Sequence, residues 1–186
     1  MLDKILTTHH INLDEFPLSY NEDGKPFLMN AIQCISISHS GDYVLIAYGD
    51  SEVGVDIQKC VDIPKLMQSL IFLPDELTYI NSLPSNSRKD PLVQLWTMKE
   101  SYLKYLGTGL TKEMNTFIVN MKDGSVMDIG GELLPRIHIK SFPVFEDYYV
   151  SICSKARDAS SDFQVSFFEN CKKFNKKVSS RFSWDF

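Results

Sequence analysis

The most informative segment of this chain is Leu95-Trp96-Thr97-Met98-Lys99-Glu100-Ser101-Tyr102-Leu103-Lys104. Apolar side chains recur through and around it at helical spacing, and we expect them to face the core: Leu92, Leu95, Trp96, Leu103 and Leu106. Asp90 is a suitable N-cap, Pro91 suits the first turn, and Gly107 is a common residue at a helix end. The segment therefore predicts one long helix, with Glu100 at the edge of its buried stripe and Lys104 one turn further on.

A second informative segment, Val53-Gly54-Val55-Asp56-Ile57-Gln58, lies upstream and is apolar except near its end. Its β-branched residues predict a strand with a single carboxylate. The apolar run 43–48 precedes it, and Gly49-Asp50-Ser51 between the two runs predicts a hairpin. The carboxylates of Asp56 and Glu100 suit a hard cation, and the lysines of the helix suit phosphoryl oxygens. The two segments together predict a metal-and-phosphate site.

The remaining elements indicate an α+β fold with mainly antiparallel strands packed against helices. Strands are predicted at 35–38, 116–121, 136–140 and 148–153, and short helices at 66–72 and 75–80. The Asp-Gly step in 21–26 predicts a turn. Because strands and helices do not alternate strictly, a parallel βαβ sheet is disfavoured.

Composition excludes several classes of function. A chain of 186 residues with a net charge of −5 fits one domain, of one or two lobes, and gives no sign of nucleic-acid binding or of an anionic membrane surface. No apolar run approaches the roughly 18 residues of a membrane span, and the start lacks the pattern of a secretory signal. The scattered cysteines have neither metal-ligand nor redox spacing: Cys34, Cys60, Cys153 and Cys171. We expect a cytoplasmic protein with reduced thiols.

The C-terminal residues differ from the rest in charge. A basic cluster without intervening acids consists of Lys172, Lys173, Lys176, Lys177 and Arg181. Apolar residues of the same region fall on one helical face: Phe167, Phe168, Cys171, Phe174 and Val178. This pattern predicts a basic amphipathic helix. It either docks its apolar face with the lysines in water, which we favour, or serves as a partner-binding tail.

Four motifs occur in order along the chain: Gly24-Lys25-Pro26, Ile37-Ser38-His39-Ser40-Gly41, Gly54-Val55-Asp56-Ile57, and Trp96-Thr97-Met98-Lys99-Glu100-Ser101 with Lys104. Any one of them occurs by chance in many proteins, whereas four in order are specific. Their order and spacing resemble the 4′-phosphopantetheinyl transferases of the surfactin-synthetase-activating (Sfp-like) type. The likeness runs from about Asp23 to Cys153 and does not extend convincingly to the C-terminal residues.

The resemblance implies an enzyme that transfers the phosphopantetheine arm of coenzyme A to a serine of an acyl or peptidyl carrier protein. The implied cofactor is Mg²⁺, and the by-product is adenosine 3′,5′-bisphosphate. By position, Asp56 and Glu100 would hold the metal, Glu100 would take the serine proton directly or through water, and Lys104 would stabilise charge on the pyrophosphate. Three residues would contact the nucleotide and its phosphates: Lys25, Ser38 and His39.

The chain departs from the family pattern in two ways. The metal strand of the family usually has Asp-x-Glu, and here Gln58 stands in the third position, so we expect it to be at most a weak metal ligand. Long members have two similar halves related by a pseudo-twofold, with coenzyme A between them, and here we expect the first half to be incomplete. We therefore divide the chain into a remnant of the N-terminal lobe (1–22), a transferase-like domain (23–154) and a C-terminal extension (155–186). A lobe without its pair predicts a homo-oligomer or poor solubility.

Ordinary structural interpretations remain open for each residue. Glu100 and Lys104 suit a surface i,i+4 pair, and Asp56 suits a strand-end acid that binds backbone amides. His39 suits a turn and Lys25 a solvated hairpin. The apolar run 61–73 is either the carrier contact or the core of a short helix. At the level of function, the alternatives are a truncated, weak or inactive remnant that binds coenzyme A or a carrier without turnover, and an unrelated α+β binding module.

Overall fold

The structure is a computed structural model that describes residues 12–31, 33–84, 89–109, 113–155, 163–169 and 177–181. A hairpin of β1 (Leu18–Tyr20) and β2 (Pro26–Leu28) contains the turn predicted at 21–26. A four-stranded sheet, ordered β11-β10-β4-β3, consists of β3 (Cys34–Ser40), β4 (Tyr43–Gly49), β10 (Phe163–Glu169) and β11 (Lys177–Arg181).

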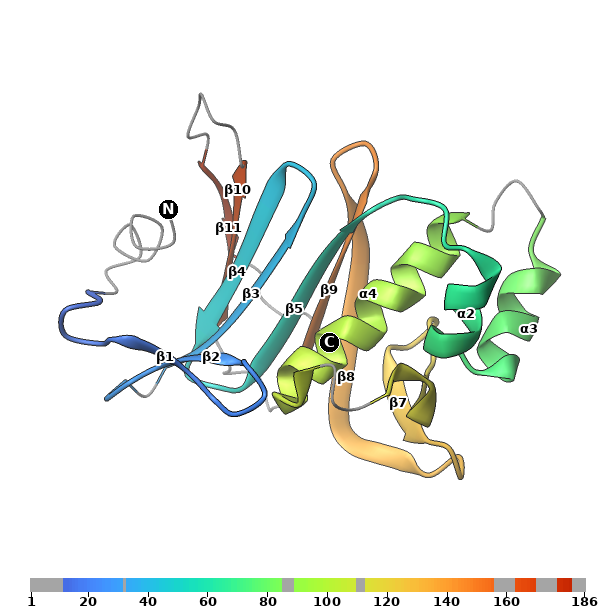
Figure 1. Cartoon of the computed structure of the whole chain (residues 1–186), viewed down its shortest axis with the longest axis horizontal. Helices are drawn as coiled ribbons and strands as arrows, with labels where there is room; N and C mark the ends of the chain where they lie inside the picture. The colour runs from blue at the N-terminus through green and yellow to red at the C-terminus, as the bar shows by residue number, and fades with distance from the viewer. Residues whose placement is uncertain are drawn as a thin grey trace.

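A five-stranded sheet, ordered β5-β9-β8-β7-β6, consists of β5 (Val53–Lys59), β6 (Phe117–Val119), β7 (Ser125–Asp128), β8 (Leu133–Val144) and β9 (Tyr148–Lys155). The α-helices are α2 (Lys65–Ile71), α3 (Pro74–Ser82) and α4 (Lys89–Leu106), and a 3₁₀ turn spans Met114–Thr116. Every backbone ladder within the described ranges is antiparallel. The predicted α+β class is confirmed. Figure 1 shows α4 crossing the five-stranded sheet, with α2 and α3 beyond one side and the β1–β2 hairpin on the other.

The two faces of β5 have different neighbours because side chains alternate along a strand. Val53, Val55 and Ile57 are fully buried in a cluster with β4, β9 and β10. The intervening Gly54 lies against α4, where an added Cβ would sit 2.0 Å from Ser101 O and 2.2 Å from Tyr105 N. Only glycine allows the strand and the helix to come this close.

The long helix predicted from its periodicity is confirmed as α4. It ends at Leu106, and the next residue, Gly107, has a φ of 75° and donates its N–H to Leu103 O at 2.9 Å. Two details of the prediction are wrong. Asp90 lies in the first turn of the helix rather than before it, and Leu106 is 39% exposed rather than in the core.

The predicted hairpin between 43–48 and 52–57 is also wrong. The two runs do form strands, but β4 pairs with β3 and β10, and β5 pairs with β9 in the other sheet. Gly49-Asp50-Ser51 therefore carries the chain from one sheet to the next. Both edges of β4 are already occupied, one of them by a strand from the C-terminal region, and local turn signals carry no information about that strand.

The basic amphipathic helix predicted near the C-terminus is wrong for the residues that the structure describes. Phe163–Glu169 and Lys177–Arg181 are strands, and β10 pairs with β4 along its whole length. Val165 and Phe167, two residues apart, are buried against the five-stranded sheet. This period of two fits a strand, whereas the prediction used a helical period. Residues 170–176, which held much of the predicted helix, lie outside the described ranges, as do residues 1–11.

Cys34, Cys60 and Cys153 carry free thiols, and Cys171 lies outside the described residues. Of the helices that the structure describes, none combines the length and the apolar character that a membrane crossing requires.

Candidate active site

Asp56 is the centre of the candidate site. The side chain is nearly fully buried on β5, and its Oδ1 forms an ion pair with Lys104 Nζ of α4 at 2.6 Å. Ser38 Oγ of β3 also donates to Oδ1, at 2.7 Å, and Gln58 Nε2 donates to Oδ2 at 3.2 Å. A buried carboxylate needs such partners, because an unpaired charge in the interior is costly. The site therefore brings together four predicted residues from three elements.

Glu100 lies one turn before Lys104 on α4 and is partly buried. Burial raises the pKa of the Glu100 carboxyl above its ordinary value, and the nearby negative charge of Asp56 raises this pKa further. Lys104 and a hydrogen bond from Trp96 act on the pKa in the opposite direction. Two carboxylates that repel each other in a buried setting attract a cation.

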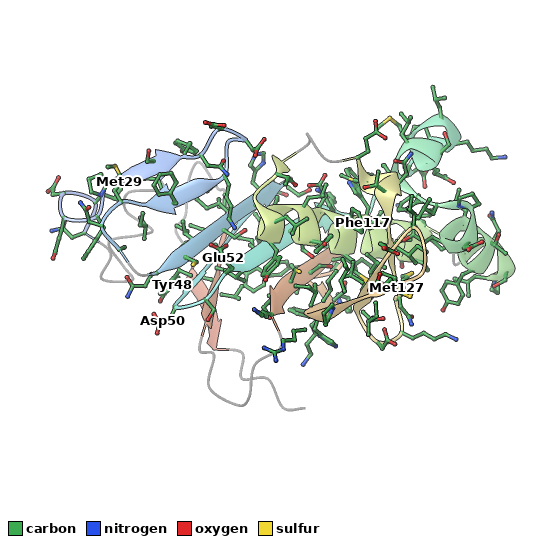
Figure 2. The ribbon with its side chains drawn as sticks, turned by 90° about the horizontal axis from the view of Figure 1, so that it is seen from below. Met29, Tyr48, Asp50, Glu52, Phe117 and Met127 are labelled. Carbon is green, nitrogen blue, oxygen red and sulfur yellow. The ribbon has the colours of Figure 1, made fainter. Side chains whose placement is uncertain are left out.

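A cavity of about 210 Å³ opens beside these groups. Glu100 and Lys104 line it from α4, and Lys25 and Pro26 line it from the β1–β2 hairpin. Lys25 Nζ donates to Glu52 Oε2 at 2.5 Å and to Tyr105 O at 3.0 Å, so the hairpin is joined to both β5 and α4. Glu52 stands at the start of the β5 region in Figure 2. A second recess of about 550 Å³ also has Lys25 and Pro26 in its wall.

His39 lies on the face of β3 that points away from Asp56. Ser38 faces Asp56, and the next residue of the strand points to the opposite face. His39 is exposed on this opposite face of β3. The same face carries Ile35, which belongs to the apolar cluster beneath the β1–β2 hairpin.

The donor set fits Mg²⁺. This ion usually takes one or two protein carboxylates and completes its octahedron with water and substrate phosphate. Asp56 and Glu100 supply two carboxylates, and their mutual repulsion favours a cation between them. Gln58 directs its amide nitrogen at Asp56 rather than its oxygen. Across the part of the chain that the structure describes, no three His, Cys, Asp or Glu residues form a metal-binding group.

Sequence reasoning missed the structural role of Lys99. Its side chain is fully buried, and its Nζ donates to Glu76 Oε2 at 2.9 Å, Met114 O at 2.9 Å and Phe117 O at 2.7 Å. Phe117 lies beside α4 in Figure 2. Burial lowers the pKa of Lys99, while Glu76 acts to raise it. Sequence spacing suggests only that Lys99 is near Glu100; it does not reveal carbonyl oxygens contributed by a later segment.

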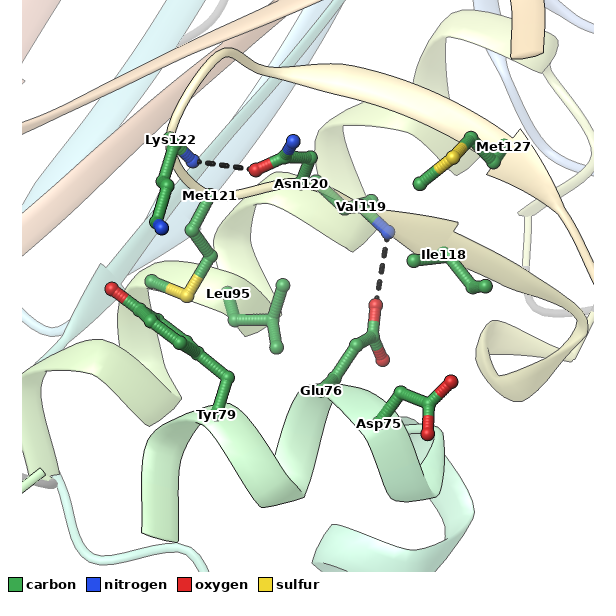
Figure 3. A pocket seen from close by; sticks show the side chains of 10 residues that line it. All are labelled: Asp75, Glu76, Tyr79, Leu95, Ile118, Val119, Asn120, Met121, Lys122 and Met127. Atoms are coloured by element: carbon green, nitrogen blue, oxygen red, sulfur yellow. Dashed lines mark hydrogen bonds between the residues drawn. The ribbon is translucent and has the colours of Figure 1, made fainter. Parts of the chain in front are cut away.

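A third cavity, of about 180 Å³, lies between α3 and the β6–β7 region and contains none of the predicted site residues (Figure 3). Tyr79, Leu95 and Met121 give it an apolar lining. In its wall Glu76 Oε1 accepts the N–H of Val119 at 3.0 Å, which ties α3 to β6.

Known proteins resemble this chain over the region that holds the candidate site. Residues 52–153 match the sequence model of the 4′-phosphopantetheinyl transferase superfamily. The chain is 31% identical to the 4′-phosphopantetheinyl transferase gsp of Aneurinibacillus migulanus, over 72% of this chain and 56% of that protein. It is 28% identical to the 4′-phosphopantetheinyl transferase ffp of Bacillus subtilis and 26% identical to the 4′-phosphopantetheinyl transferase Sfp of B. subtilis strain 168. Each of these two matches covers 87% of this chain and 73% of the relative.

Among solved structures, a holo-(acyl-carrier-protein) synthase from Bacillus anthracis in complex with CoA aligns with 57% of this chain at a TM-score of 0.42 and 16% identity. The family match does not depend on that alignment. The matched segment covers more than half of the chain and includes Asp56, Glu100 and Lys104. The predicted resemblance is confirmed: this chain belongs to the 4′-phosphopantetheinyl transferase superfamily and is of the Sfp-like type.

Proposed function

We propose that the chain transfers the 4′-phosphopantetheine arm of coenzyme A to a serine of an acyl or peptidyl carrier protein in a Mg²⁺-dependent reaction. The observation that supports this most is the convergence of Asp56 from β5 with Glu100 and Lys104 from α4 beside one cavity. The carrier supplies the nucleophilic hydroxyl, so the protein needs no serine or cysteine nucleophile of its own.

The reaction exchanges one phosphorus–oxygen bond for another. The serine oxygen bonds to the phosphorus that carries the pantetheine arm, and the bond from that phosphorus to the bridging oxygen breaks. Adenosine 3′,5′-bisphosphate leaves with the electron pair of the broken bond. Glu100 accepts the serine proton, directly or through water, and its raised pKa suits this task because the carboxylate is more basic than an ordinary one.

The remaining groups of the site stabilise the negative charge of the coenzyme A phosphates. Asp56 and Glu100 would hold Mg²⁺, which would supply positive charge against the pyrophosphate. Lys104 is 28% exposed and lines the cavity, so its ammonium group is available to stabilise charge on the leaving phosphate. Lys25 lines both the cavity and the larger recess, which supports a contact with the nucleotide. We retain contacts from Ser38 and His39 to the nucleotide as predictions.

Helix α2 is the proposed contact for the carrier. Both sequence interpretations of 61–73 find support, because the segment has two faces. Ile71 and Phe72 are buried, whereas Leu66 is 78% exposed and Leu70 is 59% exposed. Apolar side chains exposed on one face of a short helix suit the docking of a partner protein.

The decisive experiment is intact-mass spectrometry of an apo carrier protein incubated with this chain, coenzyme A and Mg²⁺. We expect the carrier to gain one phosphopantetheine, and we expect the gain to disappear without Mg²⁺. Asp56→Asn and Glu100→Gln should each slow the transfer about 10²–10⁴-fold while the far-UV circular dichroism stays unchanged. Retained rates in these variants would contradict the roles assigned to the two carboxylates.

The alternative is a remnant that binds coenzyme A or a carrier without turnover, and the amide of Gln58 in place of a carboxylate favours it. No mass gain on several apo carriers, with Sfp active in parallel, would support this alternative. Protection of the fold by coenzyme A in a thermal melt would then separate the remnant from an unrelated binding module.

We also retain a homo-oligomer, a cytoplasmic location and the absence of nucleic-acid or membrane partners as predictions. Tyr20, Phe27 and Met29 expose apolar surface on and after the β1–β2 hairpin, which supports self-association. A clean monomer at micromolar concentration in light scattering would count against it.

A further inference from the structure

Three serines of β3 lie along the edge of β5. Val55 N–H donates to Ser36 Oγ at 3.0 Å, Ile57 N–H to Ser38 Oγ at 3.3 Å, and Lys59 N–H to Ser40 Oγ at 3.0 Å. The two strands therefore run parallel, with hydroxyl groups where backbone carbonyls would accept in an ordinary ladder. We call Ser36, Ser38 and Ser40 the serine ladder.

The serine ladder satisfies a backbone requirement. On its other edge β5 pairs with β9, so the buried N–H groups that face β3 need acceptors. A serine hydroxyl accepts such an N–H and still has its own proton to donate. The ladder can therefore pass hydrogen bonds on to the side chains of β5.

Two members of the ladder donate to the candidate metal ligands. Ser38 Oγ donates to Asp56 Oδ1 at 2.7 Å, and Ser40 Oγ donates to Gln58 Oε1 at 3.4 Å. Gln58 in turn donates from Nε2 to Asp56 Oδ2 at 3.2 Å. Both oxygens of Asp56 are thus held by groups that the ladder anchors.

A carboxylate has about four acceptor positions. Within the described residues, Ser38 and Lys104 use those of Oδ1, and Gln58 uses one of Oδ2. One position on Oδ2 therefore remains for a further partner, such as a cation. This arrangement fixes the direction of the remaining lone pair before any ligand arrives.

We propose that Ser38, and Ser40 acting through Gln58, are positioning residues that orient Asp56 to hold the divalent cation. In this assignment Gln58 acts on Asp56 through its amide hydrogen rather than as a ligand. The inference rests on the proposed function, since it assumes that Asp56 holds the metal. Outer-shell partners of this kind typically change metal affinity about 10- to 100-fold.

The test is the affinity of the full chain for Mn²⁺ alone, measured by the loss of the free-ion signal in electron paramagnetic resonance. Ser38→Ala should weaken the affinity by about tenfold or more. Ser38→Thr, which keeps the hydroxyl, should restore most of the affinity. Ser40→Ala and Gln58→Ala should each weaken it by a smaller factor, because they act on Asp56 less directly.

Ser36→Ala is the matched control. It removes the same type of hydrogen bond, from Val55 N–H, and although Ser36 lines the cavity with Glu100 and Lys104, within the described residues it forms no hydrogen bond with Asp56 or Gln58. It should therefore lower the melting temperature about as much as Ser38→Ala but leave the Mn²⁺ affinity unchanged. Equal affinities of Ser36→Ala and Ser38→Ala would overturn the positioning role.

The proposed function can fail separately in this experiment. If the wild-type chain and Asp56→Asn take up Mn²⁺ equally, the metal site itself is wrong, and the positioning role is overturned with it. If only Asp56→Asn loses the metal, and Ser38→Ala binds like the wild type, the site stands and the ladder merely supports the strand.

Discussion

Helix α4 carries two lysines, Lys99 and Lys104, and each forms an ion pair with a carboxylate. The surroundings of the two ion pairs differ. Lys99 and Glu76 are both inaccessible to solvent or nearly so, with side-chain exposures of 0% and 3%. Glu76 also accepts the N–H groups of Leu73 and Val119. Lys104, by contrast, is 28% exposed and lines a cavity together with Glu100, and the charge of its partner Asp56 acts on Glu100.

The difference shows how one helix separates stability from chemistry. Lys99 uses all three of its ammonium donors on oxygens of α3, the 3₁₀ turn and β6, so its pair is closed to any ligand. Lys104 stands among two acids, and that local excess of negative charge favours a cation. The closed pair holds the fold, and the open pair is the better candidate for catalysis.

Removing Lys99 should cause the largest loss of stability. A small loss would contradict the contrast between the two ion pairs. Lys99→Met leaves the Glu76 charge buried without its cation, and we expect a loss of about 3–5 kcal/mol in the free energy of unfolding. Urea denaturation followed by circular dichroism measures this loss. The double variant Lys99→Met with Glu76→Gln should recover part of it, because no unpaired charge then remains. A loss below about 1 kcal/mol in the single variant would mean that the pair does not hold the fold.

Removing Lys104 should have the opposite result, with a large loss of activity and a small loss of stability. Lys104→Met should lower the transfer rate about 10²–10³-fold, because a group that stabilises transition-state charge is lost. Its stability should fall by only about 1–2 kcal/mol, since the lysine is partly exposed and Asp56 keeps Ser38 and Gln58. Carrier modification by mass spectrometry and urea denaturation on the same protein samples measure both quantities. A variant that unfolds as readily as Lys99→Met would erase the distinction between the two pairs.

The smallest expected effect is the dependence of stability on pH through Glu100. Its pKa in the folded chain is raised above the ordinary 4.5, so the folded state binds this proton more tightly than the unfolded state. The resulting stabilisation is present below pH 4.5 and is lost as the pH rises through the raised value. In EDTA, Glu100→Gln should therefore melt higher than the wild type at neutral pH, and this difference should shrink on acidification. A difference in melting temperature that stays constant with pH would show that neither burial nor Asp56 raises the pKa of Glu100.

Sequence patterns predicted the elements better than their partners. The apolar periodicity of α4 and the β-branched run of β5 are local properties, so both elements were identified correctly. The pairing of β4 with β10 depends on a segment far along the chain, and a local hairpin signal could not reveal it. The short apolar run around Phe167 fits either period, and only the sheet edge that it meets selects the strand.

The sequence motifs predicted several residues of the candidate site. They did not predict the contacts that depend on how the strands lie in the structure. Asp56, Glu100, Lys104 and Lys25 lie together as the resemblance implied, although their roles stay predictions. Ser40 belongs to one of the four motifs but was given no role of its own, because a serine in a strand has no distinctive spacing. Its importance appears only when β5 lies alongside β3.

The contact at Gly54 limits how such a site can change. Main chain rests on main chain there, so the gap between strand and helix is already at its minimum and any larger side chain would force it open. Asp56 follows two residues later, and the residues of α4 that face Gly54 lie on either side of Lys104. A larger ion or a bulkier substrate can therefore be accommodated only by exchanging side chains for longer or shorter ones. The backbones of the strand and the helix cannot move closer together.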